Sequence, residues 1–422
     1  MKKLLALILV ATLVLTAAAF ATAEEFKPGS EVTLNFPSIW VGKDSKAAVF
    51  GEMVAAFNEE YAGRAKVVIE EQTDYQAYRD KIRTMITAGT VPDLFSMDGT
   101  FKLEELAASG KLMNFGPYLL GTDWGARYTQ GALSDATVDG QIFSIPFESA
   151  VFGIYYNSEL LEKAGYQEFP QTYEALFEMA EALKAQDIIA FPLMTGENAW
   201  TSMLWYSQIV LAVGGPDVYK KGLDDPAFVR AAEILKKMFD YTSSDAVGAG
   251  AAVVNGHFLN FEAAVYTNGP WFIPRFAKEG INDLGSKVKF ALPPECKDGE
   301  GTYGGLAGTV QAYLMAGVQS DPDREAAVVE FYKFITQPEW LYKLAASSGA
   351  MFFVKLDSNP DDNPLKQELL AAANAAPYIV KHFNDSVKTS AIANAFPAAL
   401  DELVLGTVDA QGFVDLLKAA GE

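Results

Sequence analysis

The chain has 422 residues and carries a formal net charge of −21 at pH 7. This charge repels polyanions at long range, so it argues against a nucleic-acid partner and favours a neutral or cationic ligand. Hydrophobic residues make up 50% of the chain and aromatic residues 12%, a composition that excludes an intrinsically disordered protein.

Residues 1–23 have the pattern of a secretory signal peptide. "MKKLLALILVATLVLTAAAFATA" begins with two lysines, continues with an apolar run and ends at the small-residue site Ala21-Thr22-Ala23. The apolar run is shorter than the about 20 residues of a membrane span. The lone cysteine, Cys296, leaves no internal disulfide, and no lipid-bearing cysteine follows the cleavage site. We therefore expect a periplasmic or otherwise extracytoplasmic protein, secreted by a cleavable signal peptide and without a lipid anchor.

The chain after residue 23 is longer than the about 250 to 300 residues at which a single core stops growing, so two domains are expected. Its first part alternates strands and helices. Strand patterns at 31–40, 65–72 and 93–98 are separated by helical patterns at 46–63 and 75–89. This order predicts a mostly parallel sheet whose ligands bind at the carboxyl ends of the strands.

A second α/β lobe is predicted from residue 138 onward. An Asp139-Gly140 turn is followed by two strands, a helix ending at Gly165 and a helix capped by Thr172. Helical patterns follow at 201–215 and 225–242, strand patterns at 262–269 and 287–294, and further helices from 324 onward. The glycine-dense stretch 299–317 suits a segment that crosses back between the lobes.

The sequence offers little for metals, cofactors or phosphate. His257 and His382 each stand alone, so a metal site is not expected. The chain lacks a G-x-S-x-G elbow, a Walker A loop, an EF-hand loop and an H-E-x-x-H motif, so no cofactor is expected. A carboxylate pair for glycoside hydrolysis stays open, because the chain has 54 acidic residues. Aromatic residues in polar loops suit sugars better, since rings stack on C–H faces while carboxylates and amides bind hydroxyls.

Four stretches together resemble one known family, the extracellular solute-binding proteins of ABC-type sugar importers, which includes the maltose-binding proteins. They are "YRDKIRTMITAGTVPDLFSMD", "VDGQIFSIPFESAVFGIYYNSELLEKAG", "NGPWFIPRF" and "AAVVEFYKFITQPEWLYKLAASSGAMFFV", in the order and at the spacing of that family. The resemblance covers almost the whole chain after the leader. It implies a type II periplasmic binding protein-like α/β fold, a ligand cleft that closes between two lobes, and a membrane permease as partner.

The resemblance also implies that Trp271 of the N-G-P-W turn lines the cleft and stacks on a sugar. The residues themselves agree, because Gly269 permits the turn and Pro270 fixes its own backbone angle, so the indole stands on a rigid platform. The alternative is that Trp271 fills the core beneath Phe272 and Phe276.

Further candidates follow the predicted strands of the first lobe. Trp40 ends the first strand and Asp44 follows it, while Tyr75 follows the second strand and Asp98 the third. For Trp40 the alternative is surface packing, and for the others it is a turn, capping or solvated-loop role.

The predicted crossing segments and one helix start supply the remaining candidates. A carboxylate at the first crossing would accept sugar hydroxyls, and small residues at the second would let a ligand or hinge approach the backbone; a plain flexible loop is the alternative there. Thr195 or Asn198 is predicted to cap the helix at 201–215, in which Trp205 is assigned to the core. The ligand-binding candidates of these segments are Glu148, Glu197, Asn198, Trp200, Tyr303, Gly304 and Gly305.

The sequence departs from the maltose-binding relatives in its C-terminal helical region. Those relatives carry another stacking Trp there, whereas Ala393 and Asn394 occupy the nearest matching place in this chain. A long maltodextrin is therefore not expected as the ligand.

We expect one lobe of residues 24–147 plus 308–349 and a second of residues 148–307 plus 350–422, each a mostly parallel sheet flanked by helices. The predicted function is that of a monomeric substrate-binding component of an ABC importer. It would capture a mono- or oligosaccharide in the cleft and deliver it to the permease without catalysis. A binding protein for a polyamine or other small cation is one alternative, and an exported glycoside hydrolase is another.

Overall fold

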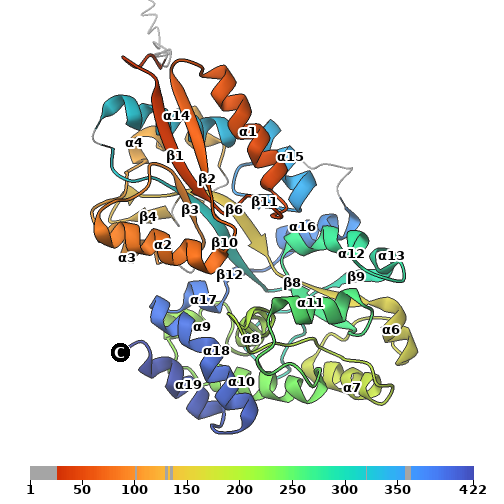
Figure 1. Cartoon of the computed structure of the whole chain (residues 1–422). Coiled ribbons are helices and arrows are strands. Elements are labelled where there is room, and N and C mark those ends of the chain that lie inside the picture. Colours follow the sequence, from red (N-terminus) through yellow and green to blue (C-terminus); the bar gives the residue numbers. More distant parts are fainter. Residues whose placement is uncertain (1–25, 100–101, 129–131, 134–135, 320, 357–362) are drawn as a thin grey trace, which may run out of the picture.

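The computed structural model describes residues 26–99, 102–128, 132–133, 136–319, 321–356 and 363–422. They form two lobes, one above the other in Figure 1, joined by strands that run between them. The predicted signal peptide at 1–23 lies outside these residues. Among the described helices, none combines the length and the apolar character that crossing a bilayer requires.

The first lobe combines the early part of the chain with a later helical return. Its elements are β1 (Val32–Ser38), α1 (Ala47–Glu60), β2 (Ala65–Glu71), α2 (Tyr75–Ala88), β3 (Phe95–Met97), α3 (Leu103–Ala107), α4 (Gly116–Leu119), α5 (Asp123–Ala126), β4 (Thr137–Val138), β5 (Gln141–Ile142), α14 (Pro322–Ile335), α15 (Pro338–Ser348) and β11 (Met351–Phe352).

The second lobe holds most of the middle of the chain and its C-terminal helices. Its elements are β7 (Gly153–Asn157), α6 (Ser158–Lys163), α7 (Tyr173–Lys184), α8 (Trp200–Gly214), α9 (Val218–Lys221), α10 (Pro226–Met238), η2 (Phe239–Tyr241), α11 (Ala251–Leu259), β8 (Val265–Asn268), η3 (Pro270–Phe272), α12 (Ile273–Lys278), α13 (Leu284–Lys287), β9 (Val288–Ala291), α16 (Pro364–Ala375), β12 (Ile379–Lys381), α17 (Phe383–Ser386), α18 (Ser390–Leu405) and α19 (Ala410–Ala419).

The first lobe begins with the predicted β-α-β unit. β1 pairs with β2 in parallel, with Val32 opposite Ala65 and Ser38 opposite Glu71. Phe36 of β1 lies edge-on to Phe50 of α1, with ring centroids 5.4 Å apart. The same ring contacts Phe331 of α14 at 6.2 Å, so a helix from much later in the chain closes the core over this strand.

Two strands, β6 (Ile145–Val151) and β10 (Leu306–Met315), carry the chain between the lobes, as Figure 1 shows. They pair antiparallel, because β6 takes the chain into the second lobe and β10 brings it back. The register shifts on both sides of Ala312, which marks a β-bulge at Gln311.

The strand pairing is mixed, which corrects the expectation that each sheet is mostly parallel. β3 and β11 join the crossing strands antiparallel, and β12 joins β10 in parallel. In the second lobe β8 and β9 both lie antiparallel to β7. Alternating strands and helices predict parallel neighbours only where consecutive strands pair, whereas β7 lies between β8 and β9, which come from much later in the chain.

The ends of α2 and α7 follow local sequence rules. Asp74 accepts a hydrogen bond from the Ala77 amide at the start of α2, and Gly89 ends this helix with a φ of +75°. Thr172 caps α7 as predicted, accepting from the Ala175 amide at 3.2 Å.

The predicted cap of α8 is wrong. The residue before this helix is Ala199, in a left-handed conformation and without a side-chain cap. Thr195 instead accepts a hydrogen bond from the Gly248 amide at 2.8 Å, which ties the preceding loop to another loop of the same lobe. Local sequence rules could not find this partner, because it is far away in the chain.

Each lobe has its own hydrophobic core. Residues from 32–147 and 310–354 build the core of the first lobe, and residues from 150–307, 365–369 and 383–417 build that of the second. Trp205 is 1% exposed within the second core, which confirms its assignment to packing. Val354 belongs to the first core, because the pairing of β11 with β6 keeps the chain on this lobe beyond the predicted boundary at 349.

His257 links three segments of the second lobe near its surface. Its Nδ1 lies 2.7 Å from Glu262 and its Nε2 lies 3.0 Å from Asp245. Burial alone would lower the pKa of His257, but the hydrogen bonds with these two carboxylates outweigh burial and raise the pKa above its ordinary value of 6.5.

We expect His257→Gln to reduce the free energy of unfolding by roughly 0.5 to 1 kcal/mol at pH 5.5 and to change it little at pH 9. A raised folded-state pKa means that the charged ring stabilises the fold fully below the unfolded pKa of about 6.5, and that this stabilisation is lost as pH rises through the folded pKa. Urea unfolding at the two pH values measures the difference. An equal loss at both values would contradict a charge-dependent role.

Candidate functional site

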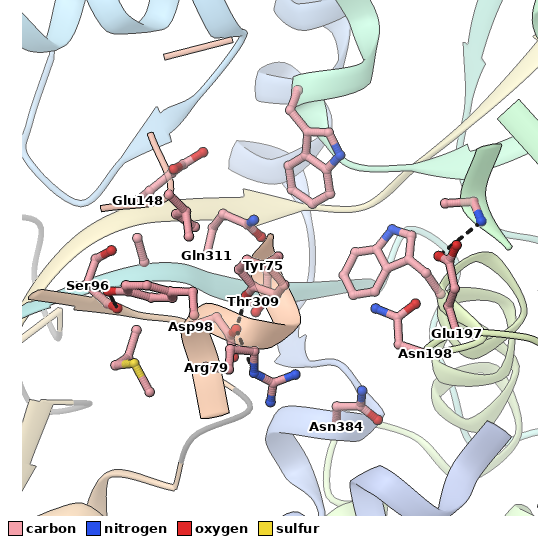
Figure 2. Close-up of a pocket in the computed structure, with 18 of the residues that line it drawn as sticks. Tyr75, Arg79, Ser96, Asp98, Glu148, Glu197, Asn198, Thr309, Gln311 and Asn384 are labelled. Carbon is pink, nitrogen blue, oxygen red and sulfur yellow. Dashed lines mark hydrogen bonds and ion pairs between the residues drawn. The ribbon is translucent and has the colours of Figure 1, made fainter. Parts of the chain in front are cut away.

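A cavity of about 970 Å³ lies between the two lobes. Figure 2 shows side chains from both lobes and from the crossing strands facing it. The first lobe contributes Ile39, Trp40, Asp44, Lys46, Asp74, Tyr75, Tyr78, Arg79, Ser96, Met97, Asp98 and Gly99. The crossing strands contribute Glu148, Thr309, Gln311 and Ala312, and the second lobe contributes Glu197, Asn198, Trp200, Ala251, Trp271, His382, Asn384, Ala393, Asn394 and Pro397.

Two indoles form an aromatic wall on the second-lobe side. The rings of Trp200 and Trp271 lie 5.9 Å apart at 38° to each other, and both side chains are half-buried. Phe152, which is fully buried, supports both rings from behind in edge-on contacts at 5.5 Å and 6.2 Å. The wall is therefore a braced surface of two flat rings with part of their area open to the cavity.

The turn that carries Trp271 has no room for a side chain before the proline. A Cβ placed on Gly269 would lie 2.3 Å from two atoms of the Trp271 ring, so the indole folds back over this residue. Gly269 itself has an extended backbone, with φ −84°, which any residue adopts. Glycine is required here by the close approach of the ring, and not by backbone conformation as the sequence interpretation assumed.

The loop before α8 is strained where it meets the cavity. Glu197 and Ala199 have φ values of +53° and +49°, a region that residues other than glycine rarely adopt. The Glu197 carboxylate accepts a hydrogen bond from the Ala251 amide at the start of α11 at 3.2 Å, and this contact holds the loop. The strain places Asn198 and Trp200 on the cavity wall, in keeping with the tendency of strained residues to gather at binding sites.

The first-lobe wall presents one exposed ring above an ionic cluster. Tyr75 begins α2 and is 43% exposed, while its hydroxyl donates a hydrogen bond to Asp98. Arg79, one turn further along α2, has its Nε 3.7 Å from the same carboxylate. This arrangement orients the phenol ring and balances the charge of Asp98.

A buried ion pair connects the first lobe to the first crossing strand. Lys46 Nζ lies 3.3 Å from Glu148 Oε2, and the two side chains are 8% and 1% exposed. Burial raises the pKa of Glu148 above its ordinary value, although the adjacent ammonium opposes this effect. Neither Glu148 oxygen has a hydrogen-bond partner within the described part of the chain. The ion pair with Lys46 is therefore the contact that holds this carboxylate beside the cavity.

Trp40 reaches the cavity from within the first core. It is 3% exposed and lies 5.1 Å from Phe50 and 5.4 Å from Phe147. The surface packing that the sequence offered as the alternative is therefore not found, because most of the ring is packed in the core and the residue also lines the cavity.

The base of the cavity joins the second crossing strand to α17. Thr309 donates a hydrogen bond to Asp385 at 2.5 Å, and His382 Nδ1 lies 3.3 Å from the same carboxylate. Lys102 of the first lobe donates to the carbonyls of Asn384 and Asp385, both at 2.9 Å. Burial alone would raise the pKa of Asp385, but His382, Thr309 and Lys102 bring it below its ordinary value.

Most of the predicted site residues come together at this cavity. They are Trp40, Asp44, Tyr75, Asp98, Glu148, Glu197, Asn198, Trp200 and Trp271. Tyr303, Gly304 and Gly305 lie elsewhere, beside a separate pocket of about 10 Å³. Gly304 has a φ of +87°, which favours glycine. A Cβ on Gly305 would lie 2.3 Å from the Tyr378 ring. Both glycines therefore serve the turn before β10, and the expectation that they line the interlobe cavity is corrected.

Sequence reasoning missed several polar residues of the cavity. Gln311 is a polar residue in the apolar strand "LAGTVQAYLM", which is a signal for a special position, and the bulge directs it toward the cavity. Lys46, Arg79, His382 and Asn384 carried no such signal, because their contacts come from segments far apart in the chain.

The chain matches the family of bacterial extracellular solute-binding proteins over residues 52–363. It belongs to that family. A putative binding protein of Brucella abortus (strain 2308) is 25% identical over 321 residues, which is 74% of each chain. A putative ABC transporter periplasmic-binding protein of Escherichia coli (strain K12) is 24% identical over 348 residues, 79% of this chain and 75% of the relative. A multiple sugar-binding protein of Streptococcus mutans (serotype c, strain UA159) is 23% identical over 300 residues, 68% of each chain.

A solved structure confirms the fold of this family member. A chitin oligosaccharide binding protein superposes with a TM-score of 0.82 at 21% identity, covering 93% of this chain and 98% of that one. The expected two-lobed α/β fold of type II periplasmic binding proteins, with its cleft between the lobes, is therefore correct.

We expect Gly269→Ala to shift the tryptophan emission of the protein to longer wavelength, because the new methyl group forces the Trp271 ring away from Phe152 and Trp200. Subtracting the spectrum of the corresponding Trp271→Phe variant isolates the emission of Trp271 in each protein. Gly256→Ala is the matched control, since a Cβ there meets its nearest atom at 3.9 Å. An unchanged emission of Gly269→Ala would contradict the close approach.

We expect Lys46→Met to destabilise the protein by about 3 to 5 kcal/mol, because it leaves Glu148 buried without a counter-charge. Lys81→Met is the control, because its ion pair with Glu70 is exposed and should be worth less than about 1 kcal/mol. Denaturant unfolding measures both. Adding Glu148→Gln to Lys46→Met should recover part of the loss, and the absence of any recovery would count against the pair.

Proposed function

We propose that this family member is the substrate-binding component of an ABC importer, and that it captures a mono- or oligosaccharide in the interlobe cavity and delivers it to a membrane permease. The observation that carries this proposal is the presence of flat aromatic surfaces on both sides of one cavity. Trp200 and Trp271 lie on the second lobe and Tyr75 on the first.

The aromatic surfaces fit the apolar faces of pyranose rings. Each ring has part of its area open to the cavity and is held in place, Trp200 and Trp271 by Phe152 and Tyr75 by its bond to Asp98. A ligand bound there loses hydration on both faces without requiring flexible side chains to become ordered.

The cavity's polar groups favour a neutral ligand over a cation. Asp44 and Asp74 accept backbone hydrogen bonds at the starts of helices, and Glu197 does the same for α11. Asp98 and Glu148 lie beside cationic side chains. Two of these five carboxylates have a cationic partner and the other three hold backbone amides, so a polyamine would have to compete with existing partners, whereas ligand hydroxyl groups can donate to the same oxygens.

The ligand-binding residues that we propose are those predicted residues that line the cavity, with Gln311 and Asn384 added. The relatives support the assignment by name, since one is called a multiple sugar-binding protein and another a periplasmic-binding protein of an ABC transporter. A structural neighbour is called a chitin oligosaccharide binding protein. We place the protein outside the cytoplasm, exported by residues 1–23.

Binding and release would follow from the two-lobed architecture. A sugar that contacts both walls stabilises the arrangement in which the lobes are close, so it shifts an existing equilibrium by its difference in affinity for the two states. Residues near 148–151 and 306–309, where the crossing strands pair, are the segments that would flex. The closed form would then be recognised by the permease. We propose no catalytic step.

We expect a panel of maltose, xylobiose, N,N′-diacetylchitobiose and raffinose to contain at least one sugar that raises the melting temperature of the protein. A ligand at about 100 times its dissociation constant adds about 2.7 kcal/mol to the free energy of unfolding. Trp271→Ala and Trp200→Ala should each reduce this shift strongly, because each removes a stacking surface. Trp340→Ala is the control, since Trp340 packs against Phe334 on the first lobe.

The same samples separate the alternatives. Spermidine should give no comparable shift, and a larger shift with spermidine than with every sugar would favour the cation-binding alternative. Chromogenic glycosides should remain intact, and their turnover would establish a glycoside hydrolase instead. Equal sugar shifts in wild type and in both tryptophan variants would remove the aromatic wall from the site.

A further inference from the structure

The start of helix α3 in the first lobe contacts the second lobe directly. Lys102, the residue before α3, donates hydrogen bonds from Nζ to the main-chain carbonyls of Asn384 and Asp385, both at 2.9 Å. Glu105, within α3, accepts a hydrogen bond at 2.8 Å from Ser390 Oγ at the start of α18. Figure 1 shows α17, which carries the two carbonyls, below α2 and α3 where the lobes meet. These hydrogen bonds form the α3 contact, which connects the lobes in addition to the crossing strands.

The two sides of the α3 contact are anchored in different cores. Leu103 and Leu106 of α3 are buried in the core of the first lobe. Phe383 of α17 is fully buried in the core of the second lobe, and its amide donates a hydrogen bond to Ser207 of α8 at 2.9 Å. Because each side moves with its own lobe, a rotation that separates the lobes must lengthen or break the hydrogen bonds of the α3 contact.

The α3 contact holds a buried charge. Lys102 is 9% exposed, and the Asp385 side chain is 2% exposed. A Cβ on Gly99 of the first lobe would overlap the Asp385 carboxylate, so the first-lobe backbone also lies against this group. Burial lowers the pKa of Lys102 below its ordinary value, although Asp385 opposes this effect. An ammonium withdrawn from water here depends on the carbonyls and the carboxylate that the other lobe supplies.

Asn384 connects the α3 contact to the cavity. It lines the cavity, whereas Lys102 does not. Figure 2 shows the Asn384 side chain on the cavity side of α17. Its Oδ1 is buried and has no hydrogen-bond partner within the described part of the chain. The first lobe thus holds the main chain of a second-lobe residue whose side chain belongs to the cavity wall.

We infer that the α3 contact is a latch: it stabilises the closed arrangement of the lobes, and through it Lys102 positions Asn384 for the bound sugar. This inference rests on the proposed function, in which Asn384 contacts the ligand, and it adds a positioning residue that lies outside the cavity. Closure brings Lys102 to the Asn384 carbonyl, so the ligand and Lys102 both favour the closed state. Each therefore strengthens the effect of the other.

The first test measures how fast a sugar leaves Lys102→Met, which keeps most of the side-chain length but lacks the ammonium. Stopped-flow tryptophan fluorescence is recorded with whichever of maltose, xylobiose, N,N′-diacetylchitobiose and raffinose binds the wild type. We expect dissociation to become about tenfold faster, the worth of one hydrogen bond to a charged group. Association should change less than twofold, because the latch forms after the encounter.

Lys355→Met is the matched control. Lys355 also donates to a main-chain carbonyl, that of Ala126 at 3.2 Å, but both residues belong to the first lobe. We expect this variant to show the wild-type rates. If Lys102 only supported the fold, Lys102→Met would reduce the fraction of protein that binds sugar and leave the dissociation rate unchanged.

The second test examines the coupling to Asn384. Asn384→Ala should also weaken sugar binding, because it removes a side chain that contacts the ligand. In the double variant with Lys102→Met, the loss of affinity should be smaller than the product of the two single losses, since Lys102 acts through Asn384. A loss equal to that product would overturn the positioning role.

The third test uses an exposed part of the α3 contact and does not depend on the folding of Lys102→Met. Ser390→Asp places an acidic residue in the first turn of α18, which suits the helix, but opposite Glu105 across the lobes. We expect sugar dissociation about threefold faster at low salt, from repulsion between like charges. Adding Glu105→Gln to Ser390→Asp should restore the wild-type rate.

The outcomes separate this inference from the function on which it rests. Failure of every sugar to bind the wild type would overturn the proposed function and this inference with it. Sugar binding with wild-type dissociation rates in both Lys102→Met and Ser390→Asp would overturn the inference alone.

Discussion

The antiparallel pairing of β6 with β10 is the constraint on which the rest of the structure depends. These strands carry the chain into the second lobe and back, so they fix where the lobes meet. The side chains at their centre, Glu148, Thr309 and Gln311, become the base of the cavity. The bulge at Gln311 breaks the regular alternation of the strand at the position where a polar side chain is directed toward the cavity.

Each of the five carboxylates that line the cavity in the described part of the chain has a partner within the protein. Lys46 stands beside Glu148, Arg79 beside Asp98, and helix starts take up the remaining carboxylates. The cavity thereby presents carboxylates that are held in place as oriented hydrogen-bond acceptors. Hydrogen-bonded recognition of hydroxyls is screened by salt far less than attraction between exposed charges.

Unusual backbone positions occur at two places beside the same cavity. Glu197 and Ala199 adopt left-handed conformations, and Gly269 leaves its side-chain space to the Trp271 ring. Both places carry an indole of the aromatic wall, in keeping with the tendency of strained residues to gather at binding sites.

The sequence by itself determined the local features of this protein. It determined the β-α-β start, the caps at Thr172 and Gly89, the core position of Trp205 and the aromatic turn at Trp271, because each depends on neighbours in the chain. Only the tertiary structure decided the mixed strand directions, the pairing of Lys46 with Glu148 and the place of His382, and it alone excluded Tyr303 from the cavity. These features depend on contacts between segments that are far apart in the chain, and the periodicity or motif of one segment does not specify such contacts.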